Sequence, residues 1–387
     1  MKLFTFLFIS FVLISAVTAD DQSLTVEEIA QNYGYPLEKH QITTEDGYIL
    51  TAFRVPHGRD QTSVNSKPVI FQHGAFDSSD ALFVHGPEES PAFNLANKGY
   101  DVWVTNRRGT KYGRDHTTIS PDNDVSEFWD FTFTDSIADD KANIDYILKK
   151  TGKSKLAFVG QAESFATMLT ALTTDEQKWF KDRVSFLVGV SPISKMDNLK
   201  SPLLRFLGIT DIPLNIVKIL GYKEWFGKSF SSWFKFQFVC NYFPVVCERS
   251  LQRNSDGDPS VNDRDVLRVY MGHFPGGLSV KILEHELQLY NQGKFQYFDY
   301  GKKKNLEEYG TETPPQIPVH EIKGLPMAMM VGSSDLLGTV KDNEWLRDQL
   351  SDNIKSFKIY DYGRASWYIG KDMQYLDDLD VLLKKYA

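Results

Sequence analysis

The 387-residue sequence has few cysteines and no site for N-linked glycosylation. It contains two cysteines, Cys240 and Cys247, and an even count favours one disulfide in a chain that enters the secretory pathway. The short loop between them predicts only about 2–3 kcal/mol of stabilisation from chain entropy. No Asn-x-Ser/Thr sequon occurs, so we expect no N-glycan.

The sequence also lacks an excess of positive charge, since 43 basic residues face 51 acidic ones and the net charge is −8. This balance argues against nucleic acid or an anionic membrane surface as a bulk partner. Beyond residue 19 no apolar run reaches transmembrane length, so we expect no stable transmembrane anchor. The first 19 residues combine Lys2, a continuous apolar run and the small-residue site Val17-Thr18-Ala19. This pattern predicts a signal peptide over residues 1–19 and a secreted, lysosomal or vacuolar protein.

The rest of the chain is long enough to bury a sizeable core. Strand patterns alternate with helix patterns, which predicts an α/β fold with a mostly parallel sheet flanked by helices. The strands are expected at residues 38–55 (a hairpin around Asp46-Gly47), 68–72, 100–105, 156–159, 184–190, 326–332 and 357–362, and the helices at 21–32, 90–98, 138–150 and 372–385. The alternation stops after residue 190, and residues 225–243 are rich in aromatics. We interpret this part as an inserted helical cap, with a helical layer of a second domain as the alternative.

The stretch LAFVGQAESFATML at residues 156–169 has the outline of a nucleophile elbow. In such an elbow a buried strand turns sharply into a helix and holds a reactive side chain at the turn. The pattern it requires is Gly-x-Ser-x-Gly. Here the sequence reads GQAES, so the position of the attacking hydroxyl is Ala162 and the second glycine is Ser164.

Seven segments resemble, in order, landmarks of the acid lipase family, which comprises gastric and lysosomal lipases and their insect and protist relatives. GYPLEKHQITTEDGYILTAFRVPHG is similar to the family's N-terminal lipase-associated segment, and QHGAFDSSDALFVHGPEESPAFNLANKGYDVWVTNRRGTKYGRDH resembles its oxyanion loop and following strand. The other segments are EFWDFTF, KSPLLRF, HFPGGLSV, GKFQYFDYG and TPPQIP. The resemblance covers nearly the whole mature chain. It implies an α/β-hydrolase core, a helical cap and lid over an apolar acyl pocket, and an esterase for triacylglycerols or sterol esters.

The resemblance also assigns the family's Ser-Asp-His triad to positions of this chain. The nucleophile falls on Ala162, and the acid on Asp335 in the segment VGSSDLLG. The histidine falls on Arg364 in the segment GRASWYIGKD, or on Ala365 if the register slips by one residue. The two N–H groups of the oxyanion hole fall on Ala75 and Glu163.

Two of the three triad residues are therefore absent. Alanine has no lone pair, and an arginine with a pKa above about 12 accepts no proton near neutral pH. All eight histidines precede residue 321, so none follows Asp335. Losing the nucleophile costs on the order of 10⁶ in kcat, and losing the base as well adds little.

Three nearby side chains are candidates for a substitute role. Ser164 lies on the first turn of the helix and is expected to point away from the acyl site. Glu163 lies one residue past the tip of the elbow, which is the wrong position for a carboxylate nucleophile. His73 has no nucleophile to serve, so we interpret it as a residue that organises the oxyanion loop.

A buried Asp335 without a partner would be costly. An arginine at the position of the histidine can pair with a carboxylate through two parallel hydrogen bonds. We therefore predict a salt bridge between Asp335 and Arg364 in place of the Asp–His hydrogen bond, with the two side chains within about 6 Å.

Three functional hypotheses follow. The first is a secreted pseudo-lipase that binds neutral lipid, a fatty-acyl ester or a protein partner. The second is an active lipase or carboxylic ester hydrolase with an atypical site, supported by the oxyanion loop and Asp335. The third is a structural or interaction protein whose pocket has collapsed, and the pocket volume separates it from the first. We expect no cofactor and no metal, core segments at 20–190 and 311–387, and the cap at 191–310.

Overall fold

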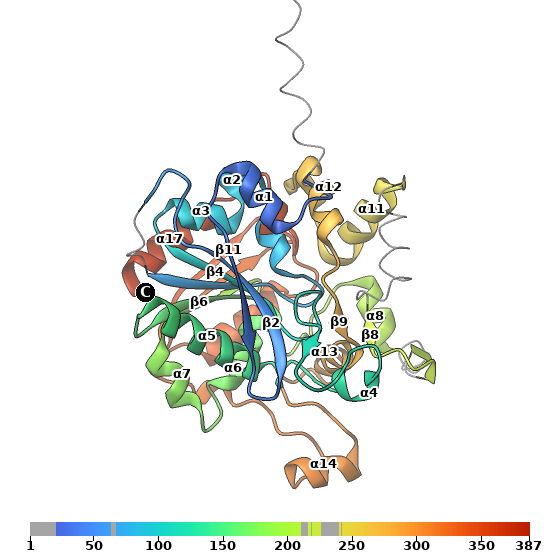
Figure 1. Cartoon of the computed structure of the whole chain (residues 1–387). Coiled ribbons are helices and arrows are strands. Elements are labelled where there is room, and N and C mark those ends of the chain that lie inside the picture. The colour runs from blue at the N-terminus through green and yellow to red at the C-terminus, as the bar shows by residue number, and fades with distance from the viewer. Residues whose placement is uncertain (1–20, 63–66, 210–215, 218, 226–239, 241) are drawn as a thin grey trace, which may run out of the picture.

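A nine-stranded, mostly parallel sheet lies at the centre of the molecule (Figure 1). The computed structural model describes residues 21–62, 67–209, 216–217, 219–225, 240 and 242–387. The predicted signal peptide, residues 1–19, and most of the aromatic-rich stretch 225–243 lie outside the described residues.

The sheet begins with an antiparallel part that contains β1 and β2 and continues as a parallel α/β sheet. The main path runs β1 (Glu38–Thr43), β2 (Tyr48–Val55), β4 (Asp101–Thr105), β3 (Pro68–Gln72), β6 (Leu156–Gln161), β7 (Val184–Val190), β10 (Met327–Gly332) and β11 (Ile354–Tyr360), and β5 (Asp115–His116) pairs with β2. Strand β2 is antiparallel to β1, β4 and β5, and all pairs from β4 to β11 are parallel. The predicted hairpin and the predicted mostly parallel sheet are both confirmed.

Helices cover both faces of the sheet because the side chains of each buried strand alternate between two apolar cores. In β6, Phe158 packs into one core, whereas Val159 packs into the other. The first core also receives α5 (Ile137–Thr151), α6 (Glu163–Ala171), α7 (Gln177–Arg183) and α15 (Val340–Gln349). The second receives α1 (Val26–Tyr33), α3 (Pro91–Asn97), α16 (Ser366–Ile369) and α17 (Tyr375–Tyr386). Figure 1 shows α5, α6 and α7 together below the sheet and α1 and α3 above it.

The element boundaries differ from the predicted ones where a local signal was overlooked. Helix α1 begins at Val26 rather than at residue 21, because Thr25 forms a capping box with Glu28. The backbone N–H of Thr25 donates to the Glu28 carboxylate at 2.8 Å, and the Thr25 hydroxyl accepts from the Glu28 N–H at 3.3 Å. Strand β11 begins at Ile354, three residues before the predicted start, and α17 begins at Tyr375 instead of residue 372.

The part of the chain between β7 and β10 contributes no described strand to the nine-stranded sheet. Its small strands β8 (Glu224–Trp225) and β9 (Leu278–Ser279) pair with each other. The remaining elements are α8 (Pro202–Ile209), α11 (Pro244–Ser255), η2 (Pro259–Val261), α12 (Arg264–His273), α13 (Val280–Gln292), α14 (Lys302–Tyr309) and η3 (Val319–Glu321). Figure 1 shows α8, α11 and α12 on one side of the sheet (right) and α14 projecting below it. This arrangement is consistent with an inserted cap, whose exact limits of 191–310 stay a prediction.

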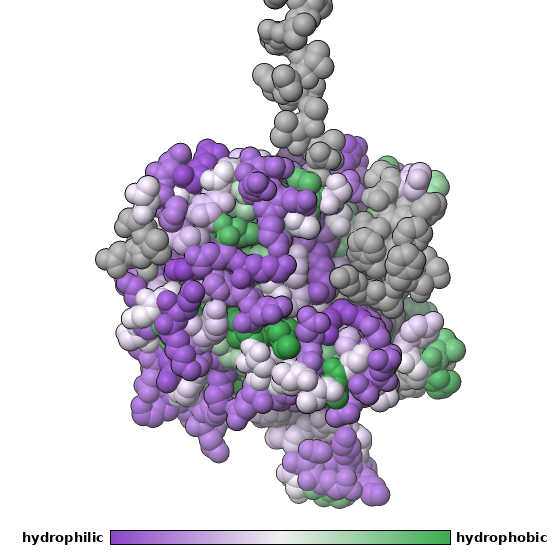
Figure 2. Space-filling view, viewed as in Figure 1, coloured by the Kyte–Doolittle hydropathy of each residue, from purple (hydrophilic) through white to green (hydrophobic). Residues whose placement is uncertain are grey.

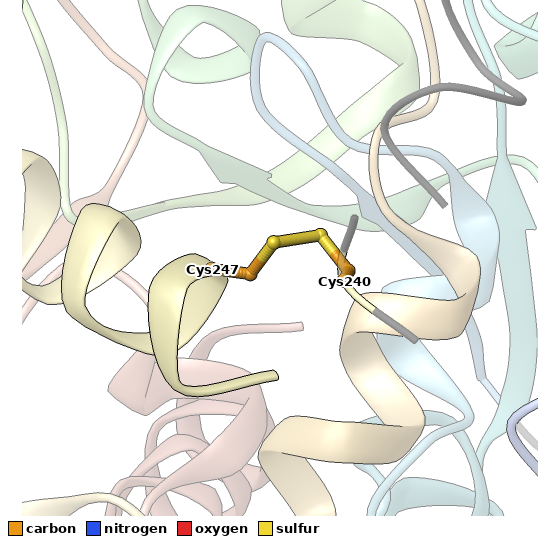
Figure 3. Close-up of a disulfide and its surroundings, with 2 residues drawn as sticks. All are labelled: Cys240 and Cys247. Atoms are coloured by element: carbon orange, nitrogen blue, oxygen red, sulfur yellow. A yellow bond between two sulfur atoms is a disulfide. The ribbon is translucent and has the colours of Figure 1, made fainter. Parts of the chain in front are cut away.

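Cys240 and Cys247 form the predicted disulfide within this part of the chain (Figure 3). Cys247 lies in α11, and the two Cα atoms are 5.4 Å apart. The same part carries most of the large hydrophobic side chains that are exposed in the described residues. These are Leu203, Phe206, Ile216, Ile219, Leu220, Tyr222, Tyr242, Phe243, Val245, Val246 and Leu306. Figure 2 shows a mostly hydrophilic face with small hydrophobic areas in its middle and at its right margin, where Figure 1 shows α8 and β8 of the cap.

Four short helices complete the described secondary structure. They are η1 (Ser79–Leu82) and α2 (Gly86–Glu89), which follow β3, and α4 (Val125–Phe128), which precedes α5, together with α16 near the C-terminus. Across the described residues, the helices are all too short or too polar to cross a bilayer.

Candidate active site

The turn between β6 and α6 has the backbone of a nucleophile elbow. Ala162 is fully buried and has φ 52° and ψ −112°, a conformation that costs a residue with a Cβ atom about 1–3 kcal/mol. Its N–H donates to the carbonyl of Val190 on β7 at 2.9 Å, which fixes the turn to the neighbouring strand. A Cβ atom at Gly160 would lie 2.8 Å from the backbone nitrogen of Phe165, so this position requires glycine. The turn therefore keeps the backbone of an elbow, although Ala162 replaces the serine and Ser164 the second glycine.

The loop after β3 lies directly against this elbow. A Cβ atom built on Gly74 would lie 3.1 Å from the methyl group of Ala162. The Gly74 N–H donates to the side-chain oxygen of Gln161 at 3.2 Å. Phe76 has a positive φ of 69°, and its carbonyl accepts from the Gly276 N–H of the cap at 2.6 Å. These contacts place Ala75, the predicted oxyanion residue, beside the tip of the elbow.

Asp335 follows β10, and its side chain is completely buried. Its Oδ1 accepts from the N–H groups of Leu337 at 2.8 Å and Gly338 at 3.0 Å. Its Oδ2 accepts from the hydroxyl of Ser191, the residue directly after β7. The carboxylate is thus well supplied with donors before any cation approaches it.

Arg364 reaches Asp335, as the sequence predicts. Its Nη1 lies 3.5 Å from Oδ2 of Asp335 and donates to the carbonyl of Ser191 at 3.1 Å. The expected salt bridge is confirmed, but the expected bidentate pairing is wrong, because two N–H groups and the Ser191 hydroxyl already occupy the carboxylate. Ala365 instead donates its N–H to Asp256 at 3.0 Å, so Arg364 supplies the side chain that faces Asp335.

A buried polar network holds the loop that carries Arg364. The Asp256 carboxylate accepts from the Asn262 side chain at 2.8 Å, and Ser366 donates to the Asn262 side-chain oxygen at 2.6 Å. A Cβ atom at Gly363 would lie 2.4 Å from an Asp256 oxygen, so the loop packs tightly on this network. Burial raises the pKa of Asp256 to about 6. Sequence reasoning missed this network because its residues lie about 100 positions apart and carry no shared motif.

The side chain of Glu163 turns into the core. Its carboxylate accepts from Arg107 at 3.1 Å, and Arg107 also donates to Asp140 at 3.1 Å. Burial raises the pKa of Glu163, and the positive charge of Arg107 opposes that rise. A carboxylate paired in this way is not a free nucleophile, which agrees with the expectation from its position. Glu163 is the first residue of α6, so its backbone N–H lies in the first turn of that helix.

Ser164 and His73 both serve the loop after β3. The Ser164 hydroxyl donates to the His73 carbonyl at 2.5 Å, so it points toward the loop backbone. Nδ1 of His73 lies 2.8 Å from the Gly74 carbonyl oxygen. Burial lowers the pKa of His73 to about 4, so the ring is neutral and donates in this contact. These contacts support the interpretation of His73 as a residue that organises the loop.

A cavity of about 80 Å³ lies beside Ala75 and Arg364. Its other lining residues are Phe76, Asp77, Ile193, Met196, Leu251, Ser255, Tyr270, Phe274, Glu286, Leu337 and Ala365. Two carboxyl groups line it that sequence reasoning missed. Burial raises the pKa of Asp77 to about 7 and, together with the negative charge of Glu163, raises that of Glu286 to about 8. In the described part of the chain no group of three or more His, Cys, Asp or Glu side chains is placed to hold a metal ion.

Backbone strain concentrates around this cavity. Among the described residues other than glycine, positive φ angles occur at Phe76, Ala162, Ser191 and Met196. Phe76 and Met196 line the cavity, Ser191 binds both Asp335 and Arg364, and Ala162 is the tip of the elbow. Such strain is typical of active sites, where the surrounding structure enforces a conformation for a functional purpose. The strained residues therefore mark the elbow and the cavity beside it as the candidate site.

Comparisons with known proteins agree with this geometry. A family model described as a partial alpha/beta-hydrolase lipase region matches residues 26–86, and a model of the alpha/beta hydrolase fold matches residues 67–218. The chain is 31% identical to lipase member K of Homo sapiens, over 95% of this chain and 92% of that protein. It is also 31% identical to gastric triacylglycerol lipase of Bos taurus, over 91% and 88% of the two chains. The structure of a soluble variant of monoglyceride lipase from Saccharomyces cerevisiae has the same fold, with a TM-score of 0.51, 16% identity and coverage of 91% and 94%.

Proposed function

This chain belongs to the acid lipase family, and on that premise we propose that it is a pseudo-lipase, a member that binds a lipid but does not hydrolyse esters. The alanine at the elbow carries the proposal. Ala162 occupies the position from which a hydroxyl would attack an acyl carbonyl, and an alkyl side chain has no lone pair to donate. Among the described residues at the elbow, the two candidate substitutes are engaged elsewhere, since Ser164 bonds the His73 carbonyl and Glu163 accepts from Arg107.

The acid–base position supports the same proposal. Arg364 contacts Asp335 where an imidazole would have to accept the proton of the nucleophile. A guanidinium keeps its proton near neutral pH and so does not act as a base. With both groups absent, the residual acceleration from binding and oxyanion groups is about 10³–10⁴ over water, which is too little for a useful lipase.

Retention of a cavity supports a binding role. The cavity beside Ala75 and Arg364 has a volume of about 80 Å³. One water molecule needs about 10–15 Å³, so the cavity has room for more than one. It is smaller than the roughly 300–1,000 Å³ of a pocket for a drug-sized ligand. We therefore infer that it holds the polar end of a lipid rather than a whole triacylglycerol. A collapsed pocket, as in a purely structural protein, is less consistent with this volume.

An active ester hydrolase with an atypical site is the second candidate. The names of the relatives, lipase member K and gastric triacylglycerol lipase, favour it, and so do the retained Asp335 and the strained loop at Phe76. It requires a nucleophile that the described residues do not present at the elbow.

Two measurements on the unmodified protein test the proposal. The first is turnover of a short-chain p-nitrophenyl ester and of a triacylglycerol between about pH 4 and pH 8, the range in which a catalytic histidine changes charge. We expect no turnover above background. Clear turnover that a serine-directed phosphonate blocks would overturn the proposal. The second measurement is extraction of the purified protein followed by mass spectrometry, for which we expect a bound lipid.

We also propose that the protein enters the secretory pathway through residues 1–19 and acts outside the cell or in a lysosomal or vacuolar lumen. The disulfide between Cys240 and Cys247 supports an oxidising compartment. The expected domain limits, a core at 20–190 and 311–387 with a cap at 191–310, are part of this proposal. N-terminal sequencing of the secreted protein is expected to begin at Asp20, and a retained first residue would contradict it.

A further inference from the structure

We propose that the cavity beside Ala75 and Arg364 binds the carboxylate of an aliphatic acid, with Arg364 as its cationic partner. This inference rests on the proposed function and specifies the ligand as a free fatty acid rather than an ester. Three features of the cavity carry it: an arginine with unused donors, two carboxyl groups and an apolar lining.

Arg364 has donors left over after its contacts with the protein. Its Nη1 bonds Ser191 and lies 3.5 Å from Asp335, but Nε and Nη2 have no hydrogen-bond acceptor among the described residues. The side chain is only 13% exposed and lines the cavity. A guanidinium presents its donors in a planar fork that matches the two oxygens of a carboxylate. An anion in the cavity would satisfy these remaining N–H groups.

Glu286 and Asp77 line the same cavity from the cap and from the loop after β3. The Glu286 carboxyl makes no hydrogen bond to a described residue, although Glu286 is only 3% exposed. Asp77 accepts one hydrogen bond, from the Tyr270 hydroxyl at 2.6 Å. A protonated carboxyl group donates one hydrogen bond, so each acid can bind a carboxylate oxygen in its neutral form.

The rest of the cavity suits the two ends of a fatty acid. Ala75, the residue expected to supply one N–H group of the oxyanion hole, lines the cavity. Beyond the polar groups, the lining consists of apolar side chains from Phe76, Ile193, Met196, Leu251, Phe274 and Leu337. Ala162 has a methyl group at the position where a serine hydroxyl would meet an ester carbonyl.

The charges around these groups predict that the acid binds more tightly at acidic pH. Glu286 faces the negative Glu163 and the positive Arg364, and Asp77 faces Tyr270, Arg364 and Lys111. Burial keeps both carboxyl groups protonated to about neutral pH, with a pKa of about 7 for Asp77 and about 8 for Glu286. As the pH rises through these values both groups lose the proton they donate and repel an anion. Binding of a carboxylate should therefore weaken between about pH 6 and pH 9.

Titration calorimetry with three eight-carbon probes tests the inference on the unmodified protein. Octanoate carries a negative head, 1-octanol a neutral head and octylammonium a positive head. We expect octanoate to bind at least about tenfold more tightly than 1-octanol at about pH 6, and this preference to disappear at about pH 9. Equal binding of octanoate and 1-octanol, tighter binding of octylammonium, or no binding of octanoate would overturn the inference.

Two variants and a matched control identify the groups responsible. Arg364→Met should abolish the preference for octanoate, whereas Arg268→Gln, which removes an exposed guanidinium on α12, should leave it unchanged. Glu286→Gln keeps a donor at all pH values, so it should retain more octanoate binding at about pH 9 than the natural chain. A preference that persists in folded Arg364→Met would contradict the role of Arg364. Because the three probes are compared on the natural chain, the inference can be refuted even where a variant does not fold.

Turnover of p-nitrophenyl octanoate, measured on the same preparation, separates this inference from the proposed function. Turnover would overturn the proposed pseudo-lipase. Absence of turnover together with equal binding of octanoate and 1-octanol would refute only the fatty-acid site.

Discussion

The elbow at Ala162 and the corner at Asp335 and Arg364 both lack a side chain of the Ser-Asp-His triad, but they differ in how much else has changed. At the elbow the hydroxyl at the tip is absent and Ser164 replaces the second glycine, but the strained φ of 52° and the contact with Val190 are present. At the corner an arginine bonds Ser191 and pairs with Asp335. Its loop also packs on the Asp256 network.

This contrast indicates which physical forces keep each region in shape. The elbow is enforced by its surroundings, because the close approach of β6 to α6 at Gly160 leaves the chain no other path. The corner is held by electrostatic interactions. Burying the Asp335 carboxylate costs desolvation free energy whether or not the residue takes part in catalysis, so it needs donors and a cation as partners. A site can therefore lose its chemistry and keep its backbone, provided that the buried charges find new partners.

The largest effect on stability is expected at Glu286, which faces Arg364 in the cavity. Its pKa rises from 4.5 in the unfolded chain to about 8 in the folded protein, so its contribution is complete below pH 4.5 and is lost as the pH rises to about 8. Glu286→Gln removes the ionisable group and should make the protein more stable than the natural chain at pH 8 by roughly 3–5 kcal/mol. Urea unfolding at both pH values measures the difference. Equal curves for the two proteins at pH 8 would show that Glu286 is not buried as described.

The second largest effect is expected from Arg364→Met, which removes the cation from the corner. Breaking a buried pair typically costs about 3–5 kcal/mol, but Asp335 keeps three other donors, so we expect about 2–3 kcal/mol. Adding Asp335→Asn should recover part of this loss, because no unpaired charge then remains. A double-mutant cycle with a coupling energy near zero would contradict the salt bridge.

The smallest effect is expected at the elbow, where the substitution should stabilise the protein, in contrast to Arg364→Met. Ala162→Gly relieves a conformation that disfavours a Cβ atom and should stabilise the protein by about 1 kcal/mol. The same exchange within a helix, Ala142→Gly in α5, is the control and should destabilise it by about 1 kcal/mol. Destabilisation by Ala162→Gly would mean that the elbow is not strained. Thermal unfolding of the two variants provides the comparison.

Much of the fold follows from local sequence signals. The buried strands were predicted within about one to three residues, because long apolar runs bounded by turn residues specify both length and register. The helix starts were less accurate, as with Thr25, where the capping pair decides the first residue. The elbow, the loop at Ala75 and the pairing of Asp335 with Arg364 followed from short motifs and the resemblance.

Other parts of the site left no trace in the sequence. Glu286 and Asp77 are single acidic residues in a helix and a loop, and only the packing of the cap against the core makes them buried neighbours of the cavity. The same holds for Asp256 and Asn262, which hold the loop of Arg364 from a distance of about 100 residues. The geometry of Asp335 also escaped prediction, because the number of donors around a carboxylate depends on the backbone of several segments.

The most direct test of an intact scaffold without chemistry is the restoration of both missing groups. Hydrolysis of a short-chain p-nitrophenyl ester is compared among the natural chain, Ala162→Ser, Arg364→His and the double variant. Because nucleophile and base act as a unit, we expect the natural chain and both single variants to stay at background and the double variant to gain at least about 10³-fold. Turnover by the natural chain, or a folded double variant that stays inactive, would contradict the account.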